Sequence, residues 1–134
     1  MSLTVITKPK IEIDEKLLKQ LKTQAEESGQ VILHFIYQSI SPWGSMIRIW
    51  PTTYLYDNHS DHQSELVHAE NISYYPEWTE CESFERKYFT LIFSGLPNSC
   101  ISFDFEEHCN GSGGEFTVAN IPRNQSDVYY ILIS

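Results

Sequence analysis

From Gln30 to the C-terminus, apolar residues recur in short runs with a period of two, and turn residues separate the runs. The clearest run is 101–106, in which Ile, Phe and Phe alternate with Ser, Asp and Glu. Successive side chains of a strand point to opposite faces, so this pattern predicts an antiparallel strand with one buried face. Counting such runs predicts about seven strands with the spacing of a β-sandwich or barrel.

The individual runs predict how the strands are arranged. Residues 31–39 are apolar on both faces, which indicates a covered strand. Pro51 interrupts the run 45–58 and implies a bulge, an edge or a switch between sheets, because proline has no N–H for a central ladder. Residues 88–96 and 100–108 flank a Gly-Leu-Pro-Asn-Ser break and are predicted to form a hairpin. The closing run 127–134 is apolar on both faces and is also predicted to be a covered strand.

The N-terminal part has a helical period. Asp14 can cap a helix in which Leu17, Leu18 and Leu21 lie on one stripe, and Gly29 supplies a stop. A helix of about 13 residues is marginal alone in water, so we expect its leucines to dock onto the rest of the chain.

Length and charge limit the function classes. A chain of 134 residues has room for one domain. Its net charge of 9 − 18 = −9 repels phosphate backbones, which excludes nucleic acid as an expected partner. No apolar run approaches the roughly 20 residues of a membrane-spanning helix, and the start lacks the pattern of a signal peptide. We therefore expect a soluble, cytoplasmic protein without membrane insertion, unless a leader has been removed.

Cys81, Cys100 and Cys109 form an odd set without a CxxC motif, so no zinc knuckle or complete disulfide framework is indicated. We expect reduced thiols with packing roles. Cys100 opens a strand, and Cys81 lies in a glutamate-rich loop whose negative charge disfavours the thiolate.

The C-terminal half carries "FTLIFSGLPNSCISFDFEE" and "GGEFTVANIPRNQSDVYYILI", with "AENIS" upstream. Over roughly residues 46–133, the chain resembles an uncharacterised bacterial family of small all-β, immunoglobulin-like domains. The resemblance implies an immunoglobulin-like antiparallel β-sandwich and brings no catalytic residue. Together with the helical period, it predicts an N-terminal arm and helix over 1–29, packed on a sandwich over 30–134. In such a sandwich the closing strand is expected to pair with 89–93.

No catalytic residue or cofactor is predicted. A nucleophile elbow needs G-x-S-x-G at a strand-to-helix turn, whereas a strand follows Ser94, Ser99 and Cys100 here. The alternative is a metal-dependent enzyme that uses the loop with His59, Asp61 and His62, whose side chains have suitable ligand atoms. Polar loops also collect such residues because they are well solvated, and a tetrahedral site needs three or four fixed ligands, so no metal site is predicted.

The aromatic residues are the strongest indication of function. Exposed rings on strands or loops bind sugars and peptides through stacking and apolar contact, although many aromatic residues of a small sandwich are buried. The segment "YYPEW" is hard to bury within a polar connection, and its exposure tests the idea. The sequence thus predicts a non-catalytic module that binds a protein, peptide or glycan through Trp43, Tyr74, Tyr75 and Trp78. A third alternative is a homodimer formed through a sheet edge or the N-terminal helix.

Overall fold

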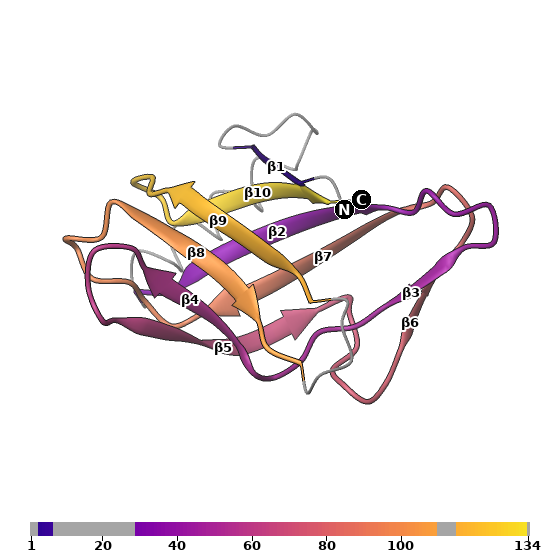
Figure 1. Cartoon of the computed structure of the whole chain (residues 1–134), viewed down its shortest axis with the longest axis horizontal. Helices are drawn as coiled ribbons and strands as arrows, with labels where there is room; N and C mark the ends of the chain where they lie inside the picture. The colour runs from indigo at the N-terminus through magenta and orange to yellow at the C-terminus, as the bar shows by residue number, and fades with distance from the viewer. Residues whose placement is uncertain (1–2, 7–28, 110–114, 134) are drawn as a thin grey trace.

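The computed structural model describes residues 3–6, 29–109 and 115–133, and these residues form an all-β fold (Figure 1). The helix predicted after Asp14 lies outside the described residues. No helix among the described residues has the length and apolar character needed to cross a membrane. The strands are β1 (Leu3–Ile6), β2 (Val31–Gln38), β3 (Ser45–Ile47), β4 (Thr53–Asp57), β5 (Gln63–Glu70), β6 (Thr79–Cys81), β7 (Arg86–Phe93), β8 (Ser102–Glu107), β9 (Thr117–Pro122) and β10 (Val128–Ile133).

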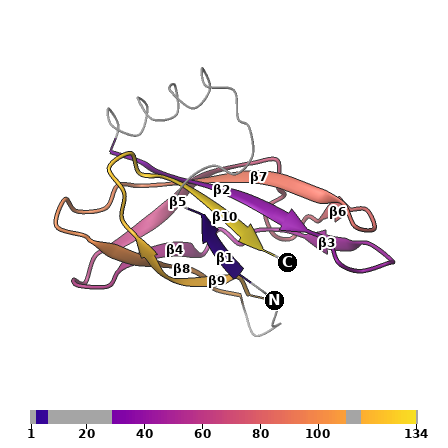
Figure 2. The same cartoon turned by 90° about the horizontal axis from the view of Figure 1, so that it is seen from above.

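Eight of these strands form one sheet in the order β1-β10-β2-β7-β5-β4-β8-β9, and β3 and β6 form a separate pair. Strand β5 belongs to both halves of the large sheet: its first residues pair with β4 and its later residues pair with β7, with a register shift between Leu66 and His68. Such an irregularity bends a strand and increases its twist. The sheet therefore folds back on itself at β5, and β8 and β9 come to lie opposite β2 and β10 (Figure 2).

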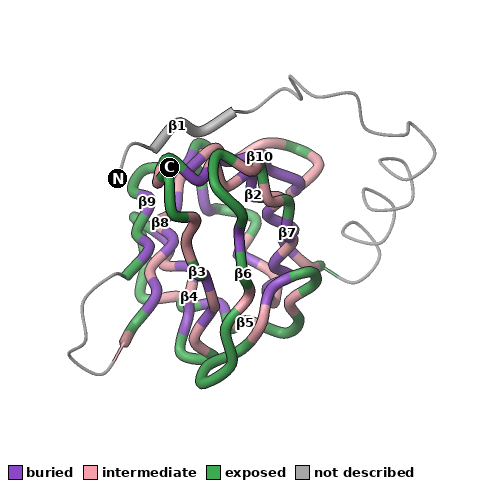
Figure 3. The backbone as a smooth tube through the Cα atoms, turned by 90° about the vertical axis from the view of Figure 1, so that its right-hand side faces the viewer, coloured by how far each residue is buried: buried purple, intermediate pink, exposed green. Residues whose placement is uncertain are grey.

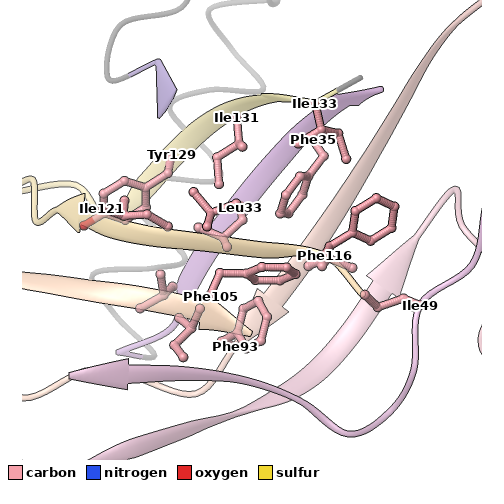
Figure 4. Packing of buried hydrophobic residues seen from close by; sticks show 14 of the residues in the cluster. Leu33, Phe35, Ile49, Phe93, Phe105, Phe116, Ile121, Tyr129, Ile131 and Ile133 are labelled. Atoms are coloured by element: carbon pink, nitrogen blue, oxygen red, sulfur yellow. The ribbon is translucent and has the colours of Figure 1, made fainter. Parts of the chain in front are cut away.

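The core lies between the two halves of the folded sheet. Phe35 on β2 and Phe105 on β8 meet there (Figure 4), with ring centroids 5.2 Å apart. The ring centroids of Phe103 on β8 and Tyr129 on β10 are 5.1 Å apart. Along β8, buried residues alternate with partly exposed ones, as the period of two predicted. The alternating pattern is thus confirmed for Ser102–Glu107, whereas Ile101, which the pattern also places on the buried face, precedes the strand and is exposed.

The prediction that residues 88–96 and 100–108 form a hairpin is wrong. Strand β7 pairs with β2 and β5, whereas β8 pairs with β4 and β9. The intervening segment crosses from one half of the sheet to the other, with Leu96 buried and the N–H of Cys100 donating to Pro97 O at 2.9 Å. At Gly95 a Cβ would overlap the carbonyl oxygen of Gly29, so the glycine permits a close backbone approach at this crossing.

The predicted partner of the closing strand is also wrong. Strand β10 does not pair with β7, because β2 lies between them. It pairs in parallel with β2, from Val128 opposite Ile32 to Ile133 opposite Tyr37, and antiparallel with β1. The prediction of a purely antiparallel fold is therefore wrong for one pair of strands, β2 and β10. The prediction that 31–39 forms a covered strand is confirmed, because the face of β2 opposite the core carries a second buried cluster of Ile32, Ile92, Val128 and Tyr130.

Candidate binding surface

The β3–β6 ribbon lies apart from the large sheet, at the end of the molecule onto which Figure 3 looks. Ser45 pairs with Cys81, and Ile47 pairs with Thr79. Ile47 and Cys81 are buried against the core, whereas Met46 and Glu80 are exposed. Because side chains alternate along each strand, the ribbon has one face toward the core and one toward solvent. Pro51 lies between β3 and β4, where the chain leaves this ribbon for the large sheet, so of the three predicted alternatives the structure has a switch between sheets.

Exposed apolar side chains are concentrated around this ribbon. Seven of the ten large exposed hydrophobic residues among the described residues lie within 40–46 or 74–84: Ile40, Trp43, Met46, Tyr74, Tyr75, Trp78 and Phe84. Single exposed apolar residues are ordinary, but a gathering of them indicates an interaction site. The ribbon face, as we call it, comprises the outward residues Trp43, Met46, Arg48, Trp50, Tyr75, Trp78, Glu80 and Glu82.

Three aromatic rings of the ribbon face surround the guanidinium group of Arg48. The rings of Trp50 and Tyr75 stack with centroids 3.7 Å apart. The Cζ atom of Arg48 lies 3.7 Å from the ring centroid of Trp78 and 4.7 Å from that of Tyr75. Its Nη1 also donates to the carbonyl oxygen of Pro76 at 3.2 Å. A guanidinium over an aromatic face is attracted by the ring quadrupole, so Arg48 joins the rings into one stack.

Backbone hydrogen bonds position this aromatic stack. Ile49 donates to Ser73 O at 2.9 Å and accepts from the N–H of Tyr75 at 2.8 Å. The N–H of Trp50 donates to Oε2 of Glu107 at 3.0 Å, and Oε1 of the same carboxylate accepts from the N–H of Phe116 at 3.2 Å. Glu107 is 2% exposed at the end of β8. A buried carboxylate that receives two backbone donors thus ties the aromatic stack to the large sheet.

Burial raises the pKa of the Glu107 carboxyl above its ordinary value of 4.5, and the bonds from Trp50 and Phe116 offset only part of this effect. The folded protein therefore holds this proton more tightly than the unfolded chain does. The resulting stabilisation is fully present below about pH 4.5 and is lost as the pH rises through the raised pKa. In Glu107→Gln this titration is absent. One of the two backbone N–H groups then faces an amide NH2 group instead of an acceptor, which lowers the free energy of unfolding by about 1–3 kcal/mol at pH 7.

We expect the difference in unfolding free energy between the wild type and Glu107→Gln to grow as the pH falls from about 7 to about 4. Urea unfolding at several pH values measures it, with the exposed Glu65→Gln as the control for a general change of charge. A difference that stays constant or shrinks on acidification would contradict the raised pKa.

A shallow pocket of about 390 Å³ lies on the ribbon beyond the aromatic stack. Its lining comprises Trp43, Gly44, Ser45, Met46, Glu80, Cys81 and Glu82. Gly44 has a φ of +80°, and a Cβ there would lie 2.7 Å from the carbonyl oxygen of Cys81, so glycine allows the turn to approach β6 closely. Trp43, in this turn, is 92% exposed. The pocket therefore has an aromatic wall and two exposed carboxylates.

The structure brings some of the predicted binding residues together and separates others. Tyr75 and Trp78 meet at the guanidinium of Arg48. Trp43 lies at the other end of the same ribbon face, in the pocket. Tyr74 pairs through its backbone with Ile49 and makes no ring contact with another described aromatic residue. All four predicted residues are nevertheless exposed, including the "YYPEW" aromatics.

Sequence reasoning missed Arg48, Met46, Glu80 and Glu82. Arg48 alternates with isoleucines in "IRIW", and the two glutamates alternate with Cys81 in "ECE". This alternation is the available signal, but the polar residues around it favour a connecting loop. The structure instead has strand β6 there, and Cys81 is buried in that strand rather than placed in a loop.

The histidine loop does not converge on a metal site. His59 and Asp61 are exposed, while Nε2 of His62 lies 2.9 Å from Ser64 Oγ and 3.0 Å from Gly95 O. Within the described ranges no group of three or more His, Cys, Asp or Glu side chains is arranged to hold a metal ion. The loop therefore contributes hydrogen bonds to the fold at its only half-buried histidine.

The serine and cysteine candidates have structural contacts. Ser94 Oγ accepts from the N–H of Glu65 at 2.9 Å, and Cys100 Sγ lies 3.3 Å from the carbonyl oxygen of Ser102. Cys81 and Cys100 are free and buried, and burial raises the pKa of both thiols. Burial also raises the pKa of Cys109, to about 11. All three thiols are thus protonated at neutral pH and poorly nucleophilic.

Comparison with known proteins adds no relative: the chain matches no protein-family model, no curated protein and no solved structure.

Proposed function

We propose that the protein is a non-catalytic binding module whose ribbon face contacts a partner protein, peptide or glycan. The observation that carries the proposal is the concentration of exposed large hydrophobic residues on and around the β3–β6 ribbon. Tryptophan, tyrosine, arginine and methionine are the residues enriched at protein interfaces. All four types occur on the ribbon face, and the interior of the sheet provides a rigid support for them.

The proposed fold class is an immunoglobulin-like β-sandwich. Two halves of a sheet that enclose one core between them support this assignment. Membership of the bacterial family that the C-terminal half resembles stays a prediction. In such a module the connections and the ribbon at one end would bind the partner, while the sheets would serve as scaffold.

The rigid aromatic stack is suited to binding. Arg48 and its hydrogen bond to Pro76 hold Trp78 and Tyr75 in defined positions before any partner arrives. A surface that is ordered in advance loses less conformational entropy on binding. Loss of a central tryptophan at such a surface typically costs more than 2 kcal/mol of binding free energy, or over about thirtyfold in affinity.

A peptide-display selection and a glycan array, both probed with the wild-type protein, test the proposal. Each ligand found is then titrated against the double variant Trp43→Ala, Trp78→Ala. The matched control is Val67→Ala, Ile101→Ala, which removes two exposed apolar side chains outside the ribbon. We expect affinity to fall at least thirtyfold in the ribbon variant and to stay within twofold in the control.

Two outcomes would overturn the proposal. One is a set of ligands that bind the ribbon variant as tightly as the wild type. The other is a selection and an array that both return no ligand at protein concentrations in the high micromolar range. Light scattering over a concentration series identifies a second copy of the chain as the partner, if the wild type dimerises and the ribbon variant does not.

A further inference from the structure

We infer that the pocket beside Trp43 takes a lysine or arginine side chain from an extended segment of a partner protein. This inference rests on the proposed binding function and specifies its ligand. Three features of the described ribbon support it: the shape and lining of the pocket, its charge, and an equivalent contact already present within the molecule.

The lining suits a side chain with an apolar stem and a charged end. Trp43 and Met46 provide apolar surface, and both are more than half exposed. Glu80 and Glu82 provide carboxylates on the same pocket. Lysine and arginine lay their methylene stems along apolar surface while the charged group reaches polar partners. An uncharged apolar side chain would instead partly desolvate the two carboxylates without replacing their contacts with water.

The charge of the ribbon favours a cationic ligand. Residues 40–50 and 74–84, all of which the structure describes, contain one basic residue and three acidic ones, which gives 1 − 3 = −2. The acidic residues are Glu77, Glu80 and Glu82, and all three are exposed. The basic residue, Arg48, already lies against Trp78 and donates to Pro76 O. With the chain at −9 overall, this end of the molecule attracts cations and repels acidic segments.

Arg48 shows the proposed contact within the same surface. Its guanidinium lies 3.7 Å from the ring centroid of Trp78. Trp43 presents a second indole on the ribbon, 92% exposed and with no ring or cation contact among the described residues. A lysine or arginine over Trp43 would repeat the Arg48 arrangement, with Glu80 and Glu82 available to its charged end.

Nuclear magnetic resonance titration tests this ligand class directly. The reporter is the indole N–H signal of Trp43, assigned by comparison with Trp43→Phe. The probes are four blocked peptides, acetyl-Gly-Xaa-Gly-amide, in which Xaa is Arg, Lys, norleucine or Glu. Norleucine keeps the length and apolar stem of lysine and lacks its charge. We expect saturable shifts with Arg and Lys, at least fivefold weaker binding of norleucine, and no shift with Glu.

Charge variants locate the binding. In Glu80→Gln, Glu82→Gln, we expect the Arg and Lys peptides to bind about tenfold more weakly, from two exposed ion pairs of about threefold each. Glu65→Gln, Glu70→Gln changes the net charge equally at exposed positions on β5 and should leave the affinity within twofold. Raising the salt concentration to about 1 M should lower the affinity of the wild type for the Arg and Lys peptides toward that of the variant Glu80→Gln, Glu82→Gln.

The outcomes separate this inference from the proposed function. If norleucine binds as tightly as lysine, or the Glu80 and Glu82 variant binds Arg and Lys normally, the cationic ligand is refuted while ribbon-face binding still stands. If none of the four peptides shifts the Trp43 signal, the pocket is not a side-chain site. Selected ligands that need the ribbon face but lack basic residues would also refute the inference and leave the proposed function intact.

Discussion

Removal of residues 129–134 is expected to leave a chain that cannot fold. Strand β10 lies within the large sheet, between β1 and β2, and pairs with both. Tyr129, Ile131 and Ile133 are fully buried in the core, and Tyr130 is 5% exposed on the opposite face. Each such side chain contributes roughly 1.5–3 kcal/mol by burial, against a whole-domain stability of about 5–15 kcal/mol. The loss from these four side chains, about 6–12 kcal/mol, is therefore comparable to the whole stability of the domain.

Circular dichroism melting and the soluble fraction after expression measure this effect. Removal of Ser134 alone is the matched control, and it should leave the melting temperature unchanged. A soluble protein without 129–134 that melts at the wild-type temperature would show that β10 is not an integral strand of the sheet.

Arg123→Ala is expected to have the second largest effect. The guanidinium of Arg123 pairs with the carboxylate of Asp127, with Nη2 2.8 Å from Oδ2, and Nη1 donates to Pro97 O at 2.8 Å and to Cys100 O at 3.2 Å. The side chains of Arg123 and Asp127 are only 15% and 20% exposed. The arginine thus joins the β9–β10 turn to the segment that crosses between the two halves of the sheet.

Loss of Arg123 leaves the Asp127 carboxylate largely buried without its counter-charge, and two carbonyl oxygens lose a donor. Removing one partner of a buried ion pair costs about 3–5 kcal/mol, and partial exposure reduces this to about 2–4 kcal/mol. We expect the melting temperature to fall by about 10 °C. Thermal unfolding measures the change, with Arg86→Ala as the control because that arginine is exposed and, among the described residues, its side chain hydrogen-bonds only to Gln38.

The double variant Arg123→Ala, Asp127→Asn separates the ion pair from the carbonyl contacts, because asparagine removes the charge, can still accept from the Tyr129 hydroxyl and tolerates the φ of 55° at this position. It should recover part of the lost stability, because the buried charge is removed together with its partner. A single variant that melts within about 2 °C of the wild type would show that the pair contributes little beyond a surface salt bridge.

Local properties of the chain were readable from the sequence. The alternation along 101–106 predicts β8 and its buried face because the two-residue period is a property of the backbone itself. Pro51 marks the passage from the ribbon to β4 because a missing N–H excludes a central ladder wherever the residue lies. The exposure of Trp43, Tyr75 and Trp78 was also predictable from their neighbours in the sequence, because the polar residues around them cannot enclose such large rings.

The tertiary structure decided which strands pair and which side chains from distant parts of the sequence come into contact. Strand β7 pairs with β2 rather than β8, and β10 runs parallel to β2, because neighbours in a sheet are chosen by how the whole set of apolar faces can be buried together. Arg48 meets Trp78, thirty residues later, only because β3 and β6 pair in one particular register. The sequence by itself indicated the strands of the large sheet from β2 to β10 and the exposure of Trp43, Tyr75 and Trp78, but not strand β6. Only the folded chain decided that an arginine and two glutamates join them, since side-chain neighbours across a ladder depend on register, which no local pattern specifies.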